Sequence, residues 1–222
     1  MAGSARLIQK GKLYMLDHSG FDLWADGYDQ SVELSEKSNV YPFAAYKDVL
    51  NEVYRIVRQT SSHGRILELG FGTGILTKKL YDDGYLITGV DFSNKMIELT
   101  KKKTLHANLI QSDFSDGLPK ELAGMRFDFI ISTYAIHHLN DRQKISLIAQ
   151  MKNALNSDGC IVFGDVMTNT AEEMAHAQAR DHGLWDEEEY YLIADDVRAW
   201  FPECKLSFSA KSYCSGVLTI TR

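Results

Sequence analysis

The stretch ILELGFGTGILTKKL, from Ile66 to Leu80, decides the fold of this chain. Together with Arg65, its first residues form a short apolar run up to Leu69, as expected of a strand that is buried on both faces. A helix-patterned segment follows after three glycines, Gly70, Gly72 and Gly74. Because glycine has no Cβ, the backbone N–H groups and the positive helix start can come close to a ligand there. A tight strand-to-helix turn without a ligand is the alternative that the glycines alone leave open.

The rest of the chain alternates in the same way. Further strands are predicted over 86–91, 108–112, 127–132 and 160–165, and helices over 74–82, 93–102 and 141–156. This alternation implies right-handed crossovers and a parallel, doubly wound α/β sheet with helices on both faces. The last two runs, 204–210 and 214–221, are typical of an antiparallel hairpin. We therefore expect a mostly parallel, seven-stranded sheet.

Composition excludes several classes of protein. The 24 basic and 30 acidic residues give a net charge of -6, which argues against nucleic acid or anionic lipid as the main partner. No apolar run predicts a signal peptide or a membrane span, so a cytoplasmic protein is expected. The 3 cysteines, Cys160, Cys204 and Cys214, lie far apart without metal-site spacing. They predict reduced thiols and no metal.

Two acidic residues end predicted strands after the glycine turn. Asp91 ends the second strand, where a carboxylate can accept hydrogen bonds from both ribose hydroxyls. Asp113 ends the third, next to Phe114, where it can accept from an adenine amine. These positions point to an adenosine. A dinucleotide fingerprint would place a glycine at position 75, where this chain has Ile75, so a nicotinamide cofactor ranks second. The chain contains no GxxxxGKS or GxxxxGKT loop, which argues against a nucleoside triphosphate.

The pattern E-x-G-x-G-x-G at Glu68–Gly74 resembles the signature of class I S-adenosylmethionine-dependent methyltransferases. VDFSNKM (90–96), QSDF (111–114), RFDFIISTYAIHHL (126–139) and LNSDGCIVFGDV (155–166) resemble later segments of that family, in the same order. FDLWADGYD (21–29) resembles the N-terminal helix of many small-molecule methyltransferases. Together with WDEEEYY (185–191) and YCSGV (213–217), it makes the chain similar to the bacterial YrrT-like group.

The resemblance implies S-adenosylmethionine as the cofactor and S-adenosylhomocysteine as its product. Carried over position by position, the binding residues are Tyr28, Glu68, Gly70, Gly72, Gly74, Asp91, Phe92, Met96, Asp113, Phe114 and Ser132. In the family's pattern the glycines and Glu68 serve the methionine part, Asp91 the ribose and Asp113 the adenine amine. Simple packing is the alternative for Met96, and a scaffold role for Tyr28.

One domain is expected over 1–222. It would comprise an N-terminal helical cap (21–58), a cofactor-binding core (64–165), a lid-like insertion (168–200) and the C-terminal hairpin (204–222). The cap and the insertion are placed to cover the carboxyl edge of the sheet, where ligands of such folds bind.

Methyl transfer needs few catalytic groups from the protein, because a sulfonium methyl is already activated and proximity can supply most of the acceleration. A general base is therefore optional. The candidates are His137, His138 and Tyr134, on the loop after the fourth strand. Capping or packing is the alternative for each histidine, and shaping of the pocket for Tyr134.

A small-molecule acceptor is expected, since the chain lacks the Pro-Pro-aromatic run of base-modifying amino-methyltransferases and the paired-glutamate loop of protein arginine methyltransferases. The acidic run 186–189 could favour a cationic acceptor, although such runs are mostly solvated surface. Aromatic candidates for an apolar pocket are Trp24, Tyr41, Tyr46, Trp185, Tyr190 and Tyr191. A non-catalytic cofactor-binding sensor or subunit and an NAD-dependent oxidoreductase remain alternatives, and both the methylated atom and the choice between monomer and homodimer stay open.

Overall fold

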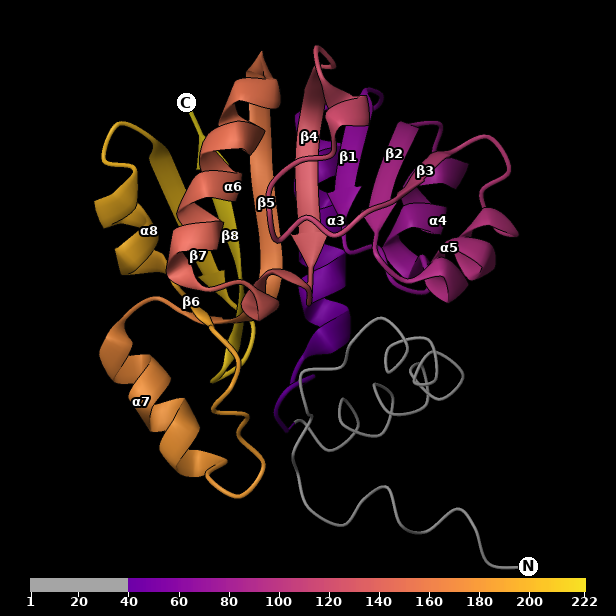
Figure 1. The fold of residues 1–222 in the computed structure, drawn as a ribbon. Helices are drawn as coiled ribbons and strands as arrows, with labels where there is room; N and C mark the ends of the chain where they lie inside the picture. The colour runs from indigo at the N-terminus through magenta and orange to yellow at the C-terminus, as the bar shows by residue number, and fades with distance from the viewer. Residues whose placement is uncertain (1–39) are drawn as a thin grey trace, which may run out of the picture.

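The computed structural model describes residues 40–222, which fold around one mixed β-sheet (Figure 1). The strand order is β3-β2-β1-β4-β5-β8-β7. The strands are β1 (Arg65–Leu69), β2 (Leu86–Asp91), β3 (Asn108–Gln111), β4 (Phe127–Thr133), β5 (Leu155–Thr168), β7 (Lys205–Ala210) and β8 (Ser215–Thr221). Neighbours from β3 to β5 pair in parallel, whereas β8 is antiparallel to both β5 and β7. The doubly wound α/β fold with an antiparallel hairpin is thus confirmed.

Helices cover both faces of this sheet. One face packs against α3 (Tyr46–Thr60) and α4 (Ile75–Asp82), the other against α6 (Asp141–Ala154) and α8 (Ala194–Trp200). In Figure 1, α3 lies behind the sheet and α6 in front of it. Further helical elements are α5 (Asn94–Lys101), α7 (Ala171–Arg180) and two short 3₁₀ turns, η1 (Lys120–Leu122) and η2 (Ile136–His138).

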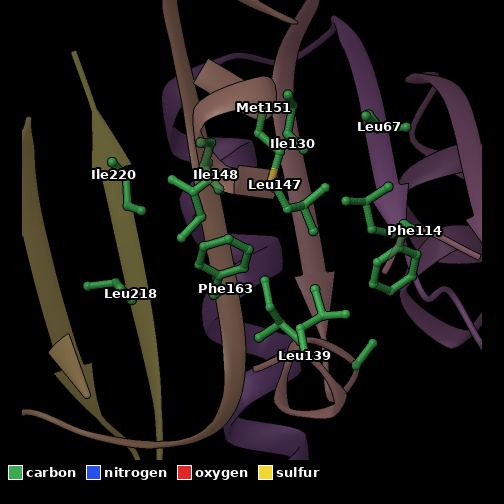
Figure 2. Packing of buried hydrophobic residues seen from close by; sticks show 14 of the residues in the cluster. Leu67, Phe114, Ile130, Leu139, Leu147, Ile148, Met151, Phe163, Leu218 and Ile220 are labelled. Atoms are coloured by element: carbon green, nitrogen blue, oxygen red, sulfur yellow. The ribbon is translucent and has the colours of Figure 1, made fainter. Parts of the chain in front are cut away.

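Burial of both sheet faces follows from the side-chain alternation of the strands. In β1, Ile66 packs toward α3 and α4, while its neighbour Leu67 packs toward the α6 side. Figure 2 shows Leu67, Ile130 and Phe163 of three adjacent strands in one apolar layer with residues of α6. Those α6 residues, Leu147, Ile148 and Met151, are 1% exposed or less. Their spacing of one and four residues places all three on one face of the helix.

Most element boundaries agree with the sequence prediction within one residue, and the larger differences lie around β5 (Leu155–Thr168). The strand expected over 160–165 begins at Leu155, where the backbone is already extended, so the helix expected to reach residue 156 ends at Ala154. Asn156 then donates from its side chain to Asp128 Oδ1 at 2.6 Å, a contact that periodicity does not encode. The predicted count of seven strands also misses β6 (Leu192–Ile193), a two-residue strand that pairs with the end of β5.

The sheet order reverses between β1 and β4, which is the topological switch point of the fold. Loops from the carboxyl ends of the parallel strands meet there, and α7 and β6 lie beyond the same end of β5 (Figure 1). The four-part division of the chain stays a prediction, and positions 21–39 of its cap lie outside the described residues. Within residues 40–222 no helix has the length and apolar character that a membrane crossing requires.

Candidate active site

A cavity opens at the carboxyl edge of the sheet. Its described lining includes ten of the residues predicted from the sequence: Glu68, Gly70, Gly72, Asp91, Phe92, Met96, Phe114, Tyr134, His137 and His138. The lining also includes five residues between positions 41 and 50, and Asp186, Glu189 and Tyr191 of the 168–200 segment. Tyr28 lies outside the described residues.

The turn after β1 is shaped by glycines with left-handed backbone. At Gly70 (φ 70°) an added Cβ would stand 2.3 Å from the Cβ of Ala135, so only glycine lets the turns after β1 and β4 touch. At Gly72 (φ 52°) nothing lies within 4 Å of an added Cβ. Because Gly72 lines the cavity, its bare backbone leaves this space for a ligand.

Asp91 ties this turn to the end of β2. Its Oδ2 accepts from Gly72 N at 2.9 Å and its Oδ1 from Ser93 N at 2.9 Å. The residue is only 4% exposed and lines the cavity. These two bonds orient the carboxylate, and each carboxylate oxygen can accept more than one hydrogen bond.

Glu68 is a second buried carboxyl group in the cavity wall. It is 1% exposed, and Thr77 Oγ1 donates to its Oε2 at 2.7 Å. Burial raises the pKa of Glu68 from 4.5 to about 8, with Asp91 adding to the effect. A cationic ligand beside this group would favour its charged form.

Three predicted cofactor residues are not among the residues that line the cavity. Gly74 approaches α5, where an added Cβ would stand 2.5 Å from Thr100 Oγ1. Asp113 is exposed, and its Oδ1 accepts from Ser115 N at 2.8 Å. Ser132 is buried in β4 and donates from Oγ to Leu69 O at 2.8 Å. Their proposed contacts with a cofactor stay predictions.

The cavity wall near the glycine turn suits an adenosine with a charged tail. Apolar side chains of Phe71, Phe92, Met96 and Phe114 offer faces to a flat base. Asp91 supplies acceptors for ribose hydroxyls. Glu68 lines the cavity next to the turn after β1, where no atom lies within 4 Å of a Cβ added at Gly72. The residues present therefore fit S-adenosylmethionine, whose sulfonium and ammonium groups need neutralisation.

The loop after β4 brings His137 to a buried carboxylate at the end of β5. His137 Nδ1 lies 2.6 Å from Asp165 Oδ1, and Asp165 is 1% exposed. Asp165 also accepts from the backbone N–H groups of Ile136 (3.2 Å) and Val166 (2.7 Å), which fix the carboxylate. Since a carboxylate only accepts, His137 must carry a proton on Nδ1, and this leaves Nε2 to act as a base.

The pKa of His137 reflects this pairing. Burial lowers it, but the charge of Asp165 and the hydrogen bond to it, with a smaller effect of Glu189, outweigh burial and raise the pKa above 6.5. An imidazole of this kind is a stronger base than a free one. His137 is therefore suited to take a proton from a molecule in the cavity, which it lines.

His138 pairs with a residue of the later segment instead. Its Nδ1 lies 3.0 Å from each carboxylate oxygen of Glu189, and both residues line the cavity. His137, His138 and Glu189 each place a potential ligand atom within 4.8 Å of the others, so they could also hold a cation. In the structure His138 and Glu189 contact each other, and the pair connects the loop after β4 to the 168–200 segment.

Comparison with known proteins identifies the family. Residues 66–159 match the family described as "Methyltransferase domain". An uncharacterized methyltransferase of Oceanobacillus iheyensis is 35% identical over 198 residues, covering 86% of this chain and 89% of the relative. The chain belongs to the class I S-adenosylmethionine-dependent methyltransferases. Another uncharacterized methyltransferase, from Anoxybacillus flavithermus, is 36% identical over 82% of this methyltransferase and 85% of its own length.

Solved structures share the fold. The complex of DhpI with S-adenosylhomocysteine aligns with a TM-score of 0.67 at 17% identity, covering 91% of this methyltransferase and 93% of that chain. Magnesium protoporphyrin IX methyltransferase of Synechocystis, also with bound S-adenosylhomocysteine, aligns at 0.64 with 16% identity, covering 90% and 96%. The expected cofactor, S-adenosylmethionine, is that of the family to which the chain belongs. Its similarity to the YrrT-like group stays a prediction.

Tyr134 shapes the wall of the methyltransferase cavity. It has φ 50°, in the left-handed region that side chains other than glycine rarely adopt, and its N–H donates to Gly164 O at 2.9 Å. Its ring packs against Phe43 and Tyr46 at centroid distances of 5.4 and 5.0 Å. The strained backbone turns this side chain toward the segment before α3.

Several residues of this site were missed from the sequence. The sequence indicates Asp165 only as the end of a strand and Glu189 only as part of an acidic run, because their histidine partners lie 28 and 51 residues away. A carboxylate at the end of β5, beside the switch point, was the signal that could have singled out Asp165. Of the aromatic candidates, Tyr41, Tyr46 and Tyr191 line the cavity, Tyr190 is 49% exposed, and Trp24 lies outside the described residues.

Proposed function

We propose that this methyltransferase transfers the methyl group of S-adenosylmethionine to a nucleophilic atom of a small molecule held in the cavity, with His137 as the proton acceptor. The observation that carries the proposal is the His137–Asp165 pair, in which a buried carboxylate fixes the tautomer of an imidazole that lines the cavity. A protein that only sensed the cofactor would have no need of an oriented base there.

The cofactor would be held by the wall near the glycine turn. Gly70 and Gly72 leave room for its methionine part next to Glu68, and Asp91 would accept from the ribose hydroxyls. The apolar side chains of Phe92, Met96 and Phe114 would contact the adenine. Asp113, exposed beside Phe114, remains a candidate for the adenine amine.

The chemistry that the bound cofactor supplies is a methyl group activated by a sulfonium centre, with S-adenosylhomocysteine as the leaving product. The protein's part is to orient the acceptor and to receive its proton. His137 Nε2 would take the proton from an O–H, N–H or S–H group as the new bond to carbon forms. Asp165 stabilises the resulting imidazolium, as the raised pKa of His137 indicates. Most of the acceleration would come from proximity.

Enclosure favours a small acceptor over a macromolecule. Five residues between positions 41 and 50 line the cavity, together with Asp186, Glu189 and Tyr191 of the later segment. A segment of polymer would need an open groove, whereas a small molecule is bound best in a concave, largely apolar pocket with a few polar groups. Tyr41, Phe43, Tyr46 and Tyr134 supply this apolar part.

The experiment is an assay of S-adenosylhomocysteine formation with an extract of one of the bacteria that encode the relatives, separated into a small-molecule filtrate and a macromolecular retentate. We expect turnover with the filtrate and none with the retentate. The His137→Asn variant should lose about 100-fold or more of the rate with unchanged S-adenosylmethionine binding. His176→Asn is the matched control, because His176 is an exposed residue of α7. Turnover confined to the retentate, or a His137→Asn variant of full activity, would contradict the proposal.

A further inference from the structure

One carboxylate of the cavity has an oxygen without a partner in the described part of the chain. Asp186 is 8% exposed and lines the cavity, and its Oδ2 has no hydrogen-bond donor among residues 40–222. Its Oδ1 accepts from Glu188 N at 2.9 Å, so the orientation of the carboxylate is fixed. Leaving a buried charged oxygen without a donor is costly, and native proteins seldom do so without a functional reason.

The backbone around Asp186 is held by two tyrosines. Its N–H donates to Tyr41 Oη at 3.1 Å, and Tyr191 Oη donates to its carbonyl at 3.3 Å. The two tyrosine hydroxyls also bond to each other. Trp185 supports this arrangement, because its ring stacks on Tyr41 at a centroid distance of 4.6 Å and meets Tyr191 edge-on at 4.8 Å. Asp186 therefore sits in a rigid, aromatic corner of the cavity.

The charges of the cavity favour a cation. Four carboxyl groups line it among the described residues, Glu68, Asp91, Asp186 and Glu189, and the described lining contains no lysine or arginine. Glu68 and Asp91 lie at the proposed cofactor end, and Glu189 is paired with His138. The unmet charge is that of Asp186, whose pKa is raised by burial and by the nearby carboxylates of Glu189 and Glu188.

The aromatic walls have the right chemistry for the same ligand. Tyr41 and Tyr191 line the cavity together with Asp186, and their rings meet edge to face at a centroid distance of 6.0 Å. Burial raises the pKa of Tyr41 to about 12, so its hydroxyl stays neutral at physiological pH. Aromatic rings attract cations through their quadrupole, and a buried carboxylate forms its strongest hydrogen bonds with charged donors.

We propose that Asp186 Oδ2 receives the ammonium group of the methyl acceptor, so that this methyltransferase acts on small amines with Tyr41 and Tyr191 around the carbon skeleton. This inference rests on the proposed function and names its substrate class. Because an ammonium nitrogen has no lone pair, the methylated atom is a second nucleophilic group of the same molecule, on the His137 side of the cavity.

The test uses two probes that differ in charge and share a carbon skeleton. The full-length protein, saturated with S-adenosylhomocysteine, is titrated by calorimetry at neutral pH with 2-phenylethylamine, which is protonated, and with 2-phenylethanol, which is neutral. We expect the amine to bind at least tenfold more tightly to the wild type. Asp186→Asn should bring the two affinities within about twofold of each other, because it keeps the shape and removes the charge.

Glu187→Gln is the matched control, since it removes one charge from an exposed neighbour and should keep the wild-type preference. Equal affinities in the wild type, or no amine binding up to millimolar concentrations, would overturn the proposal without any variant. A preference for the amine that survives Asp186→Asn would also overturn it.

Binding of S-adenosylhomocysteine, measured first on each variant, distinguishes a failure of the acceptor role of Asp186 from a failure of the proposed function. Unchanged binding to Asp186→Asn shows that the variant is folded and that Asp186 lies outside the cofactor site. A loss of cofactor affinity in this variant, with the amine preference intact, would assign Asp186 to the cofactor and overturn the acceptor role. Failure of the wild type to bind S-adenosylhomocysteine would contradict the proposed function itself.

Discussion

At the scale of single residues, Asp165 decides what His137 can do. Its carboxylate contacts Nδ1 at 2.6 Å and raises the pKa of the imidazole against the effect of burial. Replacing Asp165 with Asn removes the negative charge, so the pKa of His137 should fall. Two-dimensional NMR of the imidazole nitrogens across a pH titration measures this directly.

The same variant has a kinetic consequence. Activity that needs neutral His137 should rise with pH through the pKa of this residue, and Asp165→Asn should shift the rising limb to lower pH while lowering the plateau. Glu172→Gln, at an exposed carboxylate of α7, serves as the control. An unmoved limb, or an unchanged His137 titration, would show that Asp165 is a structural residue only.

Asp91 is the residue on which cofactor affinity should depend most. Asp91→Ala should weaken S-adenosylhomocysteine binding by about 1–3 kcal/mol, because the ribose hydroxyls lose a charged acceptor. Isothermal titration of the two proteins gives the difference. Asp113→Ala, measured in parallel, decides whether the exposed Asp113 also contacts the cofactor. If Asp91→Ala bound S-adenosylhomocysteine with wild-type affinity, the cofactor would not lie in this part of the cavity.

The site residues that could be predicted from the sequence are those that lie near the ends of predicted strands. Glu68 and Asp91 flank the glycine turn, so their position at strand ends was visible in the periodicity. The run 186–189 indicated a cationic acceptor only beside the alternative of solvated surface, because the groups that orient Asp186 include Tyr41, 145 residues away. Local sequence does not tell whether an acidic residue in such a run is exposed or buried, because its burial depends on tertiary contacts.

At the scale of elements, the turn between β1 and α4 combines two kinds of glycine. Gly72→Ala should fold, with a cost of about 1–2 kcal/mol for the left-handed backbone, and should lose cofactor affinity because the methyl enters the ligand space. Gly74→Ala should lose about 1–3 kcal/mol more stability, because its methyl meets Thr100 of α5. Urea unfolding and S-adenosylhomocysteine titration separate the two effects. Equal stability of the variants would contradict this assignment.

The central strands were predictable because burial on both faces makes them continuous apolar runs. β1 and β2 have the predicted bounds, 65–69 and 86–91. The start of β5 was not predictable, since residues 155–159 extend only through pairing with Phe127 and the side-chain contact to Asp128. β6 consists of two residues and exists because Met167 and Thr168 offer an edge for pairing.

At the scale of the whole molecule, Glu68 links stability to pH. Its pKa is about 8 in the folded protein against 4.5 for the ordinary group, so the folded state binds the extra proton between these values. The free energy of unfolding should therefore fall as pH rises through this window, by about 1.4 kcal/mol for each pH unit between the two pKa values. Glu68→Gln should lack this loss. Urea unfolding at about pH 5 and about pH 8 gives the free energy of unfolding of the wild type and of Glu68→Gln. If this free energy changed equally with pH in both proteins, Glu68 would be ionised throughout.

To act as proposed, the cavity must bind an adenosine cofactor with a sulfonium or thioether and no pyrophosphate. The most direct measurement is calorimetric titration of the purified protein with S-adenosylmethionine, S-adenosylhomocysteine and NAD in parallel. We predict 1:1 binding of the first two in the micromolar range, where a Kd of about 1 μM corresponds to about -8.2 kcal/mol, and no binding of NAD. Binding of NAD alone, or of none of the three, would contradict the assignment of the cavity.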